Sequence, residues 1–266
     1  MHHTLTGHFH HHKGFRSRFL KNPRDVIIYL PPDYNPSHYA RYPVLYMNDG
    51  QNLFDAASAF GGHEWGLDET AERLIAAREI QPLIIVGIYN TGMERLSEYT
   101  HIKDKRGRGG RARAYGKLIV NELKPMIDRE YRTLPDQADT GIGGSSLGGL
   151  VSLYFGLKYS EVFGKLLVMS PSVWWANGAI LKEVSKVRHK VRQRIWLDIG
   201  TQEDSRPEIC VRQVEGLRDA LIEKGWGLGD DLAFMRDEGG GHNERAWGHR
   251  APDALKFLFP AGGQFS

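Results

Sequence analysis

A serine lies at the centre of a glycine-framed turn near the middle of the chain. The segment 139–150 reads DTGIGGSSLGGL and contains a G-x-S-x-G pattern centred on Ser146. Gly144 and Gly148 lie two residues on either side of this serine, where a tight strand-to-helix turn leaves no room for a Cβ atom. The neighbouring Ser145 lacks this frame. The pattern predicts Ser146 as a nucleophile, although a glycine-rich turn without a catalytic role produces the same letters.

Two later segments carry the side chains that a serine nucleophile needs. An acidic loop, GTQED, occupies 200–204, and a glycine-rich loop ends in His242. The order serine, acid, histidine is that of α/β-hydrolases, in which histidine accepts the serine proton and a carboxylate orients the imidazole. We therefore expect His242 to be the base. Glu203, far enough past the strand to leave the sheet, is preferred to Asp204 as the acid, and Asp198 lies within the predicted strand.

Backbone N–H groups should complete the site by binding the oxyanion of a tetrahedral intermediate. Leu147 follows the nucleophile at a helix start, where N–H groups are free to bind an anion. The second donor is expected from the loop after the strand at 42–47, as in α/β-hydrolases. Gly50 permits a close turn there, and the Gln51 N–H is the candidate.

Tryptophans and the single cysteine are interpreted from their places between predicted elements. Trp174 and Trp175 follow a strand end, where an indole either offers a flat face to a sugar or aromatic acyl group or simply packs the loop. At least one of them is expected at the pocket. Trp65 and Trp247 are expected in the core. Cys210 is expected as a small buried hydrophobe rather than a second nucleophile.

Apolar runs alternate with helical patterns along the chain. Strands are predicted at 24–30, 42–47, 83–87, 165–169, 194–199 and 231–235, with a short one leading into the turn at Ser146. Helices are predicted at 68–80, 112–131, 147–159, 179–187, 208–224 and 243–259. Pro125 should bend the second helix. Apolar strands separated by helices predict an α/β fold with a mainly parallel sheet covered on both faces, and functional loops then gather at the carboxyl ends of the strands.

Length and composition favour one domain. The 266 residues, 41% hydrophobic and 25% charged, can bury one large core, so a single domain is expected over 1–266 with a polar N-terminal extension at about 1–23. The net charge is only +3, and its basic excess is concentrated at 103–113 rather than spread along a face, which argues against a nucleic-acid partner. Residues 90–111 show no clear periodicity and are predicted to be a mobile surface loop. The basic segment 100–113 is expected to be mobile and solvated, with binding of an acidic ligand as the alternative.

The N-terminal segment is rich in histidine. Six of the twelve histidines fall within the first twelve residues, and His8, His10 and His12 would share one face of a strand. No carboxylate or cysteine is interleaved to complete a coordination shell, so a solvated polar face is favoured over a metal site. The chemistry expected of Ser146, His242 and Glu203 requires no metal or organic cofactor, and none is expected. No membrane-spanning run or secretory signal is present, which predicts a cytoplasmic protein with no membrane partner, or a periplasmic or secreted one if a signal was trimmed.

Several blocks of the sequence resemble an esterase family. The blocks occur in the family's order over 24–259 and include YPVLYMNDGQNLFD at 42–55, GSSLG at 144–148, SPSVWW at 170–175 and GHNERAW at 241–247. The family contains enterochelin-type siderophore esterases, feruloyl and acetylxylan esterases, and esterase D. The resemblance implies an α/β-hydrolase fold in which Ser146 is the nucleophile and His242 the base, and its acid position matches Glu203. Asn48 departs from the pattern, because many relatives have histidine there.

The expected function is that of a serine carboxylesterase acting through an acyl-enzyme. Its expected substrates are small-molecule or carbohydrate-linked esters, with feruloyl or acetyl esters of carbohydrates first. A siderophore esterase is the alternative on substrate, and an acyltransferase to a sugar alcohol is the alternative on reaction. A non-catalytic ligand-binding relative is the alternative of another class. The pattern does not predict the oligomeric state.

Overall fold

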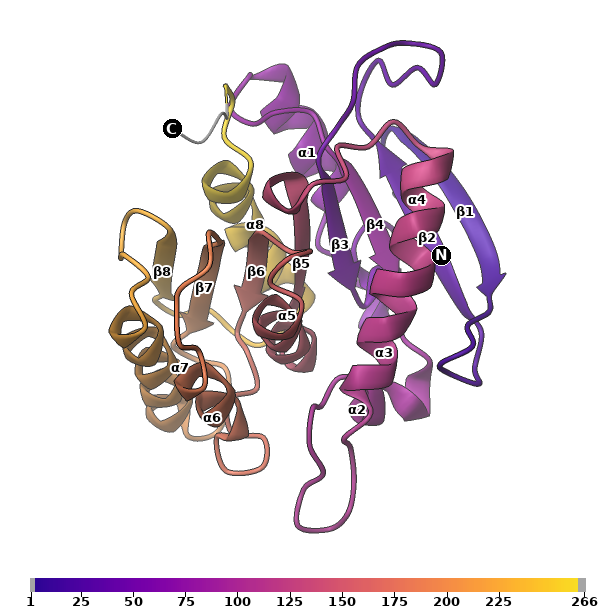
Figure 1. The fold of residues 1–266 in the computed structure, drawn as a ribbon. Helices are drawn as coiled ribbons and strands as arrows, with labels where there is room; N and C mark the ends of the chain where they lie inside the picture. The colour runs from indigo at the N-terminus through magenta and orange to yellow at the C-terminus, as the bar shows by residue number, and fades with distance from the viewer. Residues whose placement is uncertain (1–2, 263–266) are drawn as a thin grey trace.

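One eight-stranded sheet forms the centre of the computed structural model, which describes residues 3–262 (Figure 1). Its strands follow the order β1-β2-β4-β3-β5-β6-β7-β8. Their bounds are β1 (His8–Phe15), β2 (Arg24–Leu30), β3 (Val44–Asn48), β4 (Ile84–Ile88), β5 (Thr140–Ser145), β6 (Lys165–Met169), β7 (Arg194–Gly200) and β8 (Leu232–Asp237). All neighbours from β4 to β8 are parallel, and β2 is antiparallel to both β1 and β4. The predicted mainly parallel α/β sheet is confirmed.

Helices cover the two faces of the sheet in separate layers (Figure 1). One layer contains α3 (Ala112–Leu118), α4 (Lys124–Glu130), α5 (Leu147–Lys158), α6 (Ala179–Ser185) and α7 (Pro207–Glu223). The other contains α1 (Leu67–Ala76) and α8 (Glu244–Leu258). Successive side chains of β2 point to opposite faces of the sheet. Val26 and Ile28 pack in the core beneath the first helix layer, and Ile27 and Tyr29 pack in the core beneath the second. β3, β4, β6 and β7 likewise contribute apolar side chains to both cores, as a covered parallel sheet requires, whereas the glycine-rich β5 contributes only Ile142.

The predicted helix around Pro125 is divided into three consecutive segments. A π-helical turn, Ile119–Leu123, lies between α3 and α4, and Pro125 falls in the first turn of α4. Proline lacks the N–H that would bond one turn back, so it is tolerated where a first helical turn needs no such bond. The wider turn before the proline therefore lets the chain continue as a helix.

The segment predicted as an irregular loop contains short regular elements. A 3-10 turn, Gly92–Glu94, leads directly into α2 (Arg95–Glu98), so the prediction of no regular structure was wrong here. Elements this short show no hydrophobic periodicity, because a single turn presents only one apolar position. Further along, Lys103 pairs with Gly109 across a tight turn. The indole N–H of Trp175 donates to the Ile102 carbonyl at 2.9 Å, which ties the base of this turn to the core.

Four of the N-terminal histidines, His8, His10, His11 and His12, lie on the edge strand β1. Ring nitrogens of His10 and His12 lie 3.1 and 3.0 Å from the Tyr131 hydroxyl. Between residues 3 and 262, no three metal-ligating side chains gather closely enough to hold an ion. In the same part of the chain, no helix combines the length and apolarity needed to cross a bilayer.

Candidate active site

Ser146 occupies the sharp turn between β5 and α5, at the carboxyl edge of the sheet. Its backbone angles are φ 59° and ψ −123°, a strained conformation for a residue with a side chain and the one that a nucleophile elbow imposes. A Cβ on Gly144 would lie 3.0 Å from the Gly148 carbonyl carbon and 3.1 Å from Cβ of Asn48. Both framing glycines therefore let three segments of chain meet beneath the serine.

Asn48, the residue that departs from the family pattern, lies beneath this elbow. Its buried amide donates to the Gly143 carbonyl at 3.0 Å and to the Ser152 hydroxyl at 2.9 Å, and its oxygen accepts from the Tyr115 hydroxyl at 2.8 Å. These bonds tie the end of β3 to β5 and α5. The asparagine thus supports the elbow and makes no contact with the acid or the histidine.

Glu203 and His242 meet at the predicted carboxyl edge. Glu203 Oε2 lies 2.9 Å from Nδ1 of His242, and the exposed fractions of the two side chains are 3% and 34%. The second carboxylate oxygen, Oε1, accepts from the Gly200 N–H at 2.7 Å and from the Ser170 hydroxyl. The carboxylate is therefore buried with both oxygens satisfied, while the imidazole reaches the surface.

Asp204, the alternative acid, faces a different set of atoms. It accepts hydrogen bonds from the N–H and hydroxyl of Ser205, and its other oxygen lies 4.0 Å from Sγ of Cys210. The Ser205 N–H and hydroxyl hold the pKa of Asp204 below its usual range. The structure therefore brings Glu203, and not Asp204, to the histidine.

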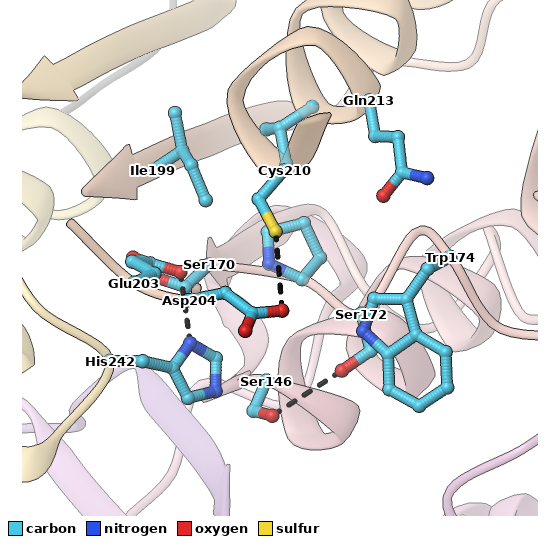
Figure 2. A pocket seen from close by; sticks show the side chains of 12 residues that line it. Ser146, Ser170, Ser172, Trp174, Ile199, Glu203, Asp204, Cys210, Gln213 and His242 are labelled. Carbon is cyan, nitrogen blue, oxygen red and sulfur yellow. Dashed lines mark hydrogen bonds and ion pairs between the residues drawn. The ribbon is translucent and has the colours of Figure 1, made fainter. Parts of the chain in front are cut away.

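Figure 2 shows His242 between the Glu203 carboxylate and Ser146, with its second ring nitrogen directed toward the serine. The Ser146 hydroxyl is turned the other way and pairs with the Ser172 hydroxyl at 3.3 Å. The serine side chain would have to rotate to meet the ring (Figure 2). Catalytic hydrogen bonds of this kind commonly tighten only when substrate binds.

Both predicted oxyanion donors lie at the starts of helical turns. The Leu147 N–H begins α5, and the Gln51 N–H lies in the 3-10 turn Gly50–Asn52 after β3. N–H groups in a first turn have no acceptor within their own helix, so they are available to an anion. Asp49 precedes the second turn in a left-handed conformation, and its carboxylate receives two bonds of 2.7 Å from Arg95. The sequence pattern did not predict this role for Arg95.

A cavity of about 150 Å³ opens beside Ser146 and His242 (Figure 2). It is bounded by loops after β6 and β7 and by the first turns of α7, and its walls mix apolar and polar groups. They include Pro171, Ser172, Trp174, Ile199, Cys210 and Gln213. Convergent polar groups beside apolar surfaces are features of a small-molecule site.

The two neighbouring tryptophans have different places. Trp174 is 53% exposed and lines the cavity, whereas Trp175 is 2% exposed and packs in the core. Only the first indole can therefore offer its face to a substrate.

Cys210 is half-buried in the cavity wall rather than in the core, and burial together with the Asp204 carboxylate raises the pKa of its thiol. Trp247 is buried, but its ring packs edge-to-face on His242 with centroids 4.9 Å apart.

The family model for esterases, described as "Putative esterase", matches residues 17–258. The chain belongs to this family. Among curated relatives, protein YbbA of Bacillus subtilis (strain 168) is 27% identical over 257 residues, which cover 93% of this esterase and 97% of YbbA. The family membership makes the chain a carboxylic ester hydrolase, as the sequence resemblance implied.

Two other relatives are longer than this esterase. The endo-1,4-beta-xylanase/feruloyl esterase of Xylanibacter ruminicola is 26% identical over 211 residues, covering 73% of this chain and 24% of that protein. The iron(III) salmochelin esterase of Escherichia coli O6:H1 is 33% identical over 155 residues, covering 57% of this chain and 33% of that protein. Among solved structures, the BES protein from Bacillus cereus has a TM-score of 0.76 at 22% identity and covers 96% of both chains. That likeness confirms the fold.

Proposed function

We propose that this esterase uses Ser146 as its nucleophile, His242 as its general base and Glu203 as the acid that orients the base. The observation that carries the proposal is the 2.9 Å contact between Glu203 and Nδ1 of His242, beside a serine in a strained elbow. A carboxylate on Nδ1 keeps the proton there and leaves Nε2 free to accept one. Solvent reaches the imidazole but not the carboxylate, which suits a base that must exchange protons with substrate and water.

The reaction follows from these positions. Nε2 of His242 takes the Ser146 proton as Oγ attacks the ester carbonyl, and the N–H groups of Leu147 and Gln51 bind the resulting oxyanion. The intermediate collapses, the C–O bond to the alcohol breaks, and His242 returns the proton to the leaving oxygen. Water then attacks the acyl-enzyme with His242 again as base, which releases the acid and restores the serine.

The size of the cavity favours an ester whose acyl group carries one ring. A dry cavity of about 150 Å³ is known to admit a molecule the size of benzene, and the cavity here has about 150 Å³ beside the nucleophile. An acetyl group would leave most of it unfilled. The exposed face of Trp174 adds an aromatic surface at the wall. We therefore place feruloyl-type esters of carbohydrates first, in line with the function named for the Xylanibacter relative.

Siderophore esters are the second candidate, because the salmochelin esterase is the relative with 33% identity. Initial rates on methyl ferulate, acetylated xylan and a catecholate siderophore, each with a Ser146→Ala blank, separate the substrate classes. We expect the highest kcat/KM on methyl ferulate. A preference for the siderophore would transfer the proposal to the second candidate, and acyl transfer to added sugar in place of free acid would indicate an acyltransferase. Absence of turnover on all three, with no label from a fluorophosphonate, would indicate a non-catalytic ligand-binding protein.

A further inference from the structure

Two buried side chains, Ser170 and Arg250, lie beside the oxygen of Glu203 that faces away from His242, and a third, Trp247, binds Ser170. Ser170 comes from the end of β6, while Trp247 and Arg250 come from α8, the helix that follows His242. Arg250 is only 1% exposed. A buried guanidinium beside a catalytic carboxylate needs an explanation, because burying a charge is unfavourable unless it is closely paired.

The hydrogen bonds around Ser170 have only one possible direction. Its hydroxyl oxygen lies 3.0 Å from Nε1 of Trp247 and 2.8 Å from Nη2 of Arg250. An indole N–H and a guanidinium can only donate, so these two bonds use both acceptor positions of the hydroxyl oxygen. Its single proton therefore goes to the remaining partner, Oε1 of Glu203. The donors behind Ser170 thus fix a bond to the acid of the catalytic pair.

Arg250 also balances the buried negative charge at this point. Its Nη2 atom lies 3.4 Å from Oδ1 of Asp198 and 3.6 Å from Oε1 of Glu203, and its Nη1 atom lies 3.2 Å from Oδ2 of Asp237. Burial raises the pKa of Asp198 to about 6, and the guanidinium opposes that rise. One cation therefore serves three carboxylates, of which Glu203 is the one in contact with His242.

Trp247 contacts both His242 and Ser170, the serine that binds Glu203. Its N–H binds Ser170, and its ring packs edge-to-face against His242 at an interplanar angle of 82°. Trp247 and Arg250 are three residues apart, so they lie on the same side of α8. His242 therefore lies directly before α8, and the first turns of that helix carry Trp247, which packs on the imidazole, and Arg250, which lies beside Glu203.

We propose that Ser170, Trp247 and Arg250 form a positioning unit that aligns Glu203 with His242. The inference rests on the proposed function, because it assigns how the acid and base of that function are held. The unit binds Oε1 of Glu203 so that Oε2 faces Nδ1 of His242. Donors on Oε1 also draw negative charge away from Oε2, which limits how strongly the carboxylate stabilises a protonated imidazole. Trp247 and Arg250 lie outside the cavity walls and act through the pair, whereas Ser170 also lines the cavity, so Trp247→Phe is the variant that separates positioning from contact with substrate.

The test is a double-mutant cycle with Glu203. Ser170→Ala and Trp247→Phe are made in the native enzyme and in Glu203→Ala, and kcat and KM are measured with a nitrophenyl ester. In the native background we expect each change to lower kcat about tenfold or more and to leave KM within about twofold. In the Glu203→Ala background the same changes should lower kcat less than about twofold. Equal losses in both backgrounds would overturn the proposal.

The variants are chosen to separate alignment from loosened packing. Trp247→Phe keeps an aromatic ring at this position but removes the N–H and part of the indole. Trp226→Phe is the matched control for the lost ring volume, because it makes the same change to a similarly buried indole, 1% exposed, outside the site. Thermal unfolding checks that each variant folds. If Trp226→Phe lowers kcat as much as Trp247→Phe does, the proposal is overturned.

A pH profile gives a readout that packing alone does not move. In Ser170→Ala, Oε2 of Glu203 carries more negative charge and favours the imidazolium, so the acid limb of kcat/KM should move to higher pH. A loss of kcat with an unchanged acid limb would overturn the proposal. Fluorophosphonate labelling of Ser146 separates the two levels, because an unlabelled native enzyme refutes the proposed function, whereas a labelled enzyme with additive variants refutes only the positioning unit.

Discussion

Replacing Glu203 by glutamine tests which way the acid must face. The Oε1 position receives the Gly200 N–H at 2.7 Å and the Ser170 hydroxyl, and Nη2 of Arg250 lies 3.6 Å away. An amide NH₂ at that position would meet only donors, so the amide oxygen must take it and the NH₂ must face Nδ1 of His242. Nδ1 would then accept a hydrogen bond, and the ring proton would move to Nε2. That tautomer cannot take a proton from the nucleophile.

The expected loss is large because the geometry stays intact while the tautomer is wrong. We expect kcat of Glu203→Gln to fall by about 10³ to 10⁴, which corresponds to about 4–5 kcal/mol. The assay is steady-state hydrolysis of nitrophenyl acetate at neutral pH, with Asp204→Asn as the control because that carboxylate bonds locally to Ser205. The control should stay within about threefold of the native rate. A Glu203→Gln enzyme with more than about a tenth of native activity, or an equally impaired Asp204→Asn, would refute the assignment of the acid.

Three further outcomes are expected. About half of the Trp174 indole surface is open to a ligand. Trp174→Ala should therefore lower kcat/KM on methyl ferulate about fivefold to thirtyfold, or about 1–2 kcal/mol, and change nitrophenyl acetate hydrolysis little. Equal losses on both substrates would contradict this expectation. Burial raises the pKa of the Cys210 thiol, so its alkylation should be slow at neutral pH and faster at alkaline pH. Because the thiol lines the cavity, alkylation should block methyl ferulate hydrolysis, and full activity after complete labelling would place the thiol elsewhere. Burial and the neighbouring Glu69 raise the pKa of Asp68 to about 8. Ionising this carboxyl therefore destabilises the folded state as pH rises from about 4 to 8. The melting temperature of Asp68→Asn should fall less between about pH 5 and 8.5 than that of the native protein.

The strands and the elbow could be predicted because their signals are local. Apolar runs such as 165–169 coincide with β6, and the glycines around Ser146 mark a turn whose geometry depends on its own residues. The chain order of Ser146, Glu203 and His242 is also visible in one dimension, since parallel strands bring the loops after β5, β7 and β8 to the same edge.

The surroundings of the proposed triad could not be predicted in the same way. Ser170, Trp247 and Arg250 meet through contacts between residues about 80 positions apart, and neither composition nor periodicity encodes that pairing. The spacing of Trp247 and Arg250 on one helix face after His242 was the available signal. The difference between Trp174 and Trp175 likewise depends on which ring the turn at Ile102 covers, a contact 73 residues away along the chain.

The central claim is that Ser146 carries the acyl group, and mass spectrometry of the trapped enzyme tests it most directly. The enzyme is treated with a fluorophosphonate, digested, and the labelled residue is identified at peptide level, because Ser145 and Ser172 are close enough to be confused with the nucleophile. The structure predicts one label, on Ser146, that is lost in Ser146→Ala and retained in Ser172→Ala. A label on another residue, or undiminished ester hydrolysis by Ser146→Ala, would contradict the account.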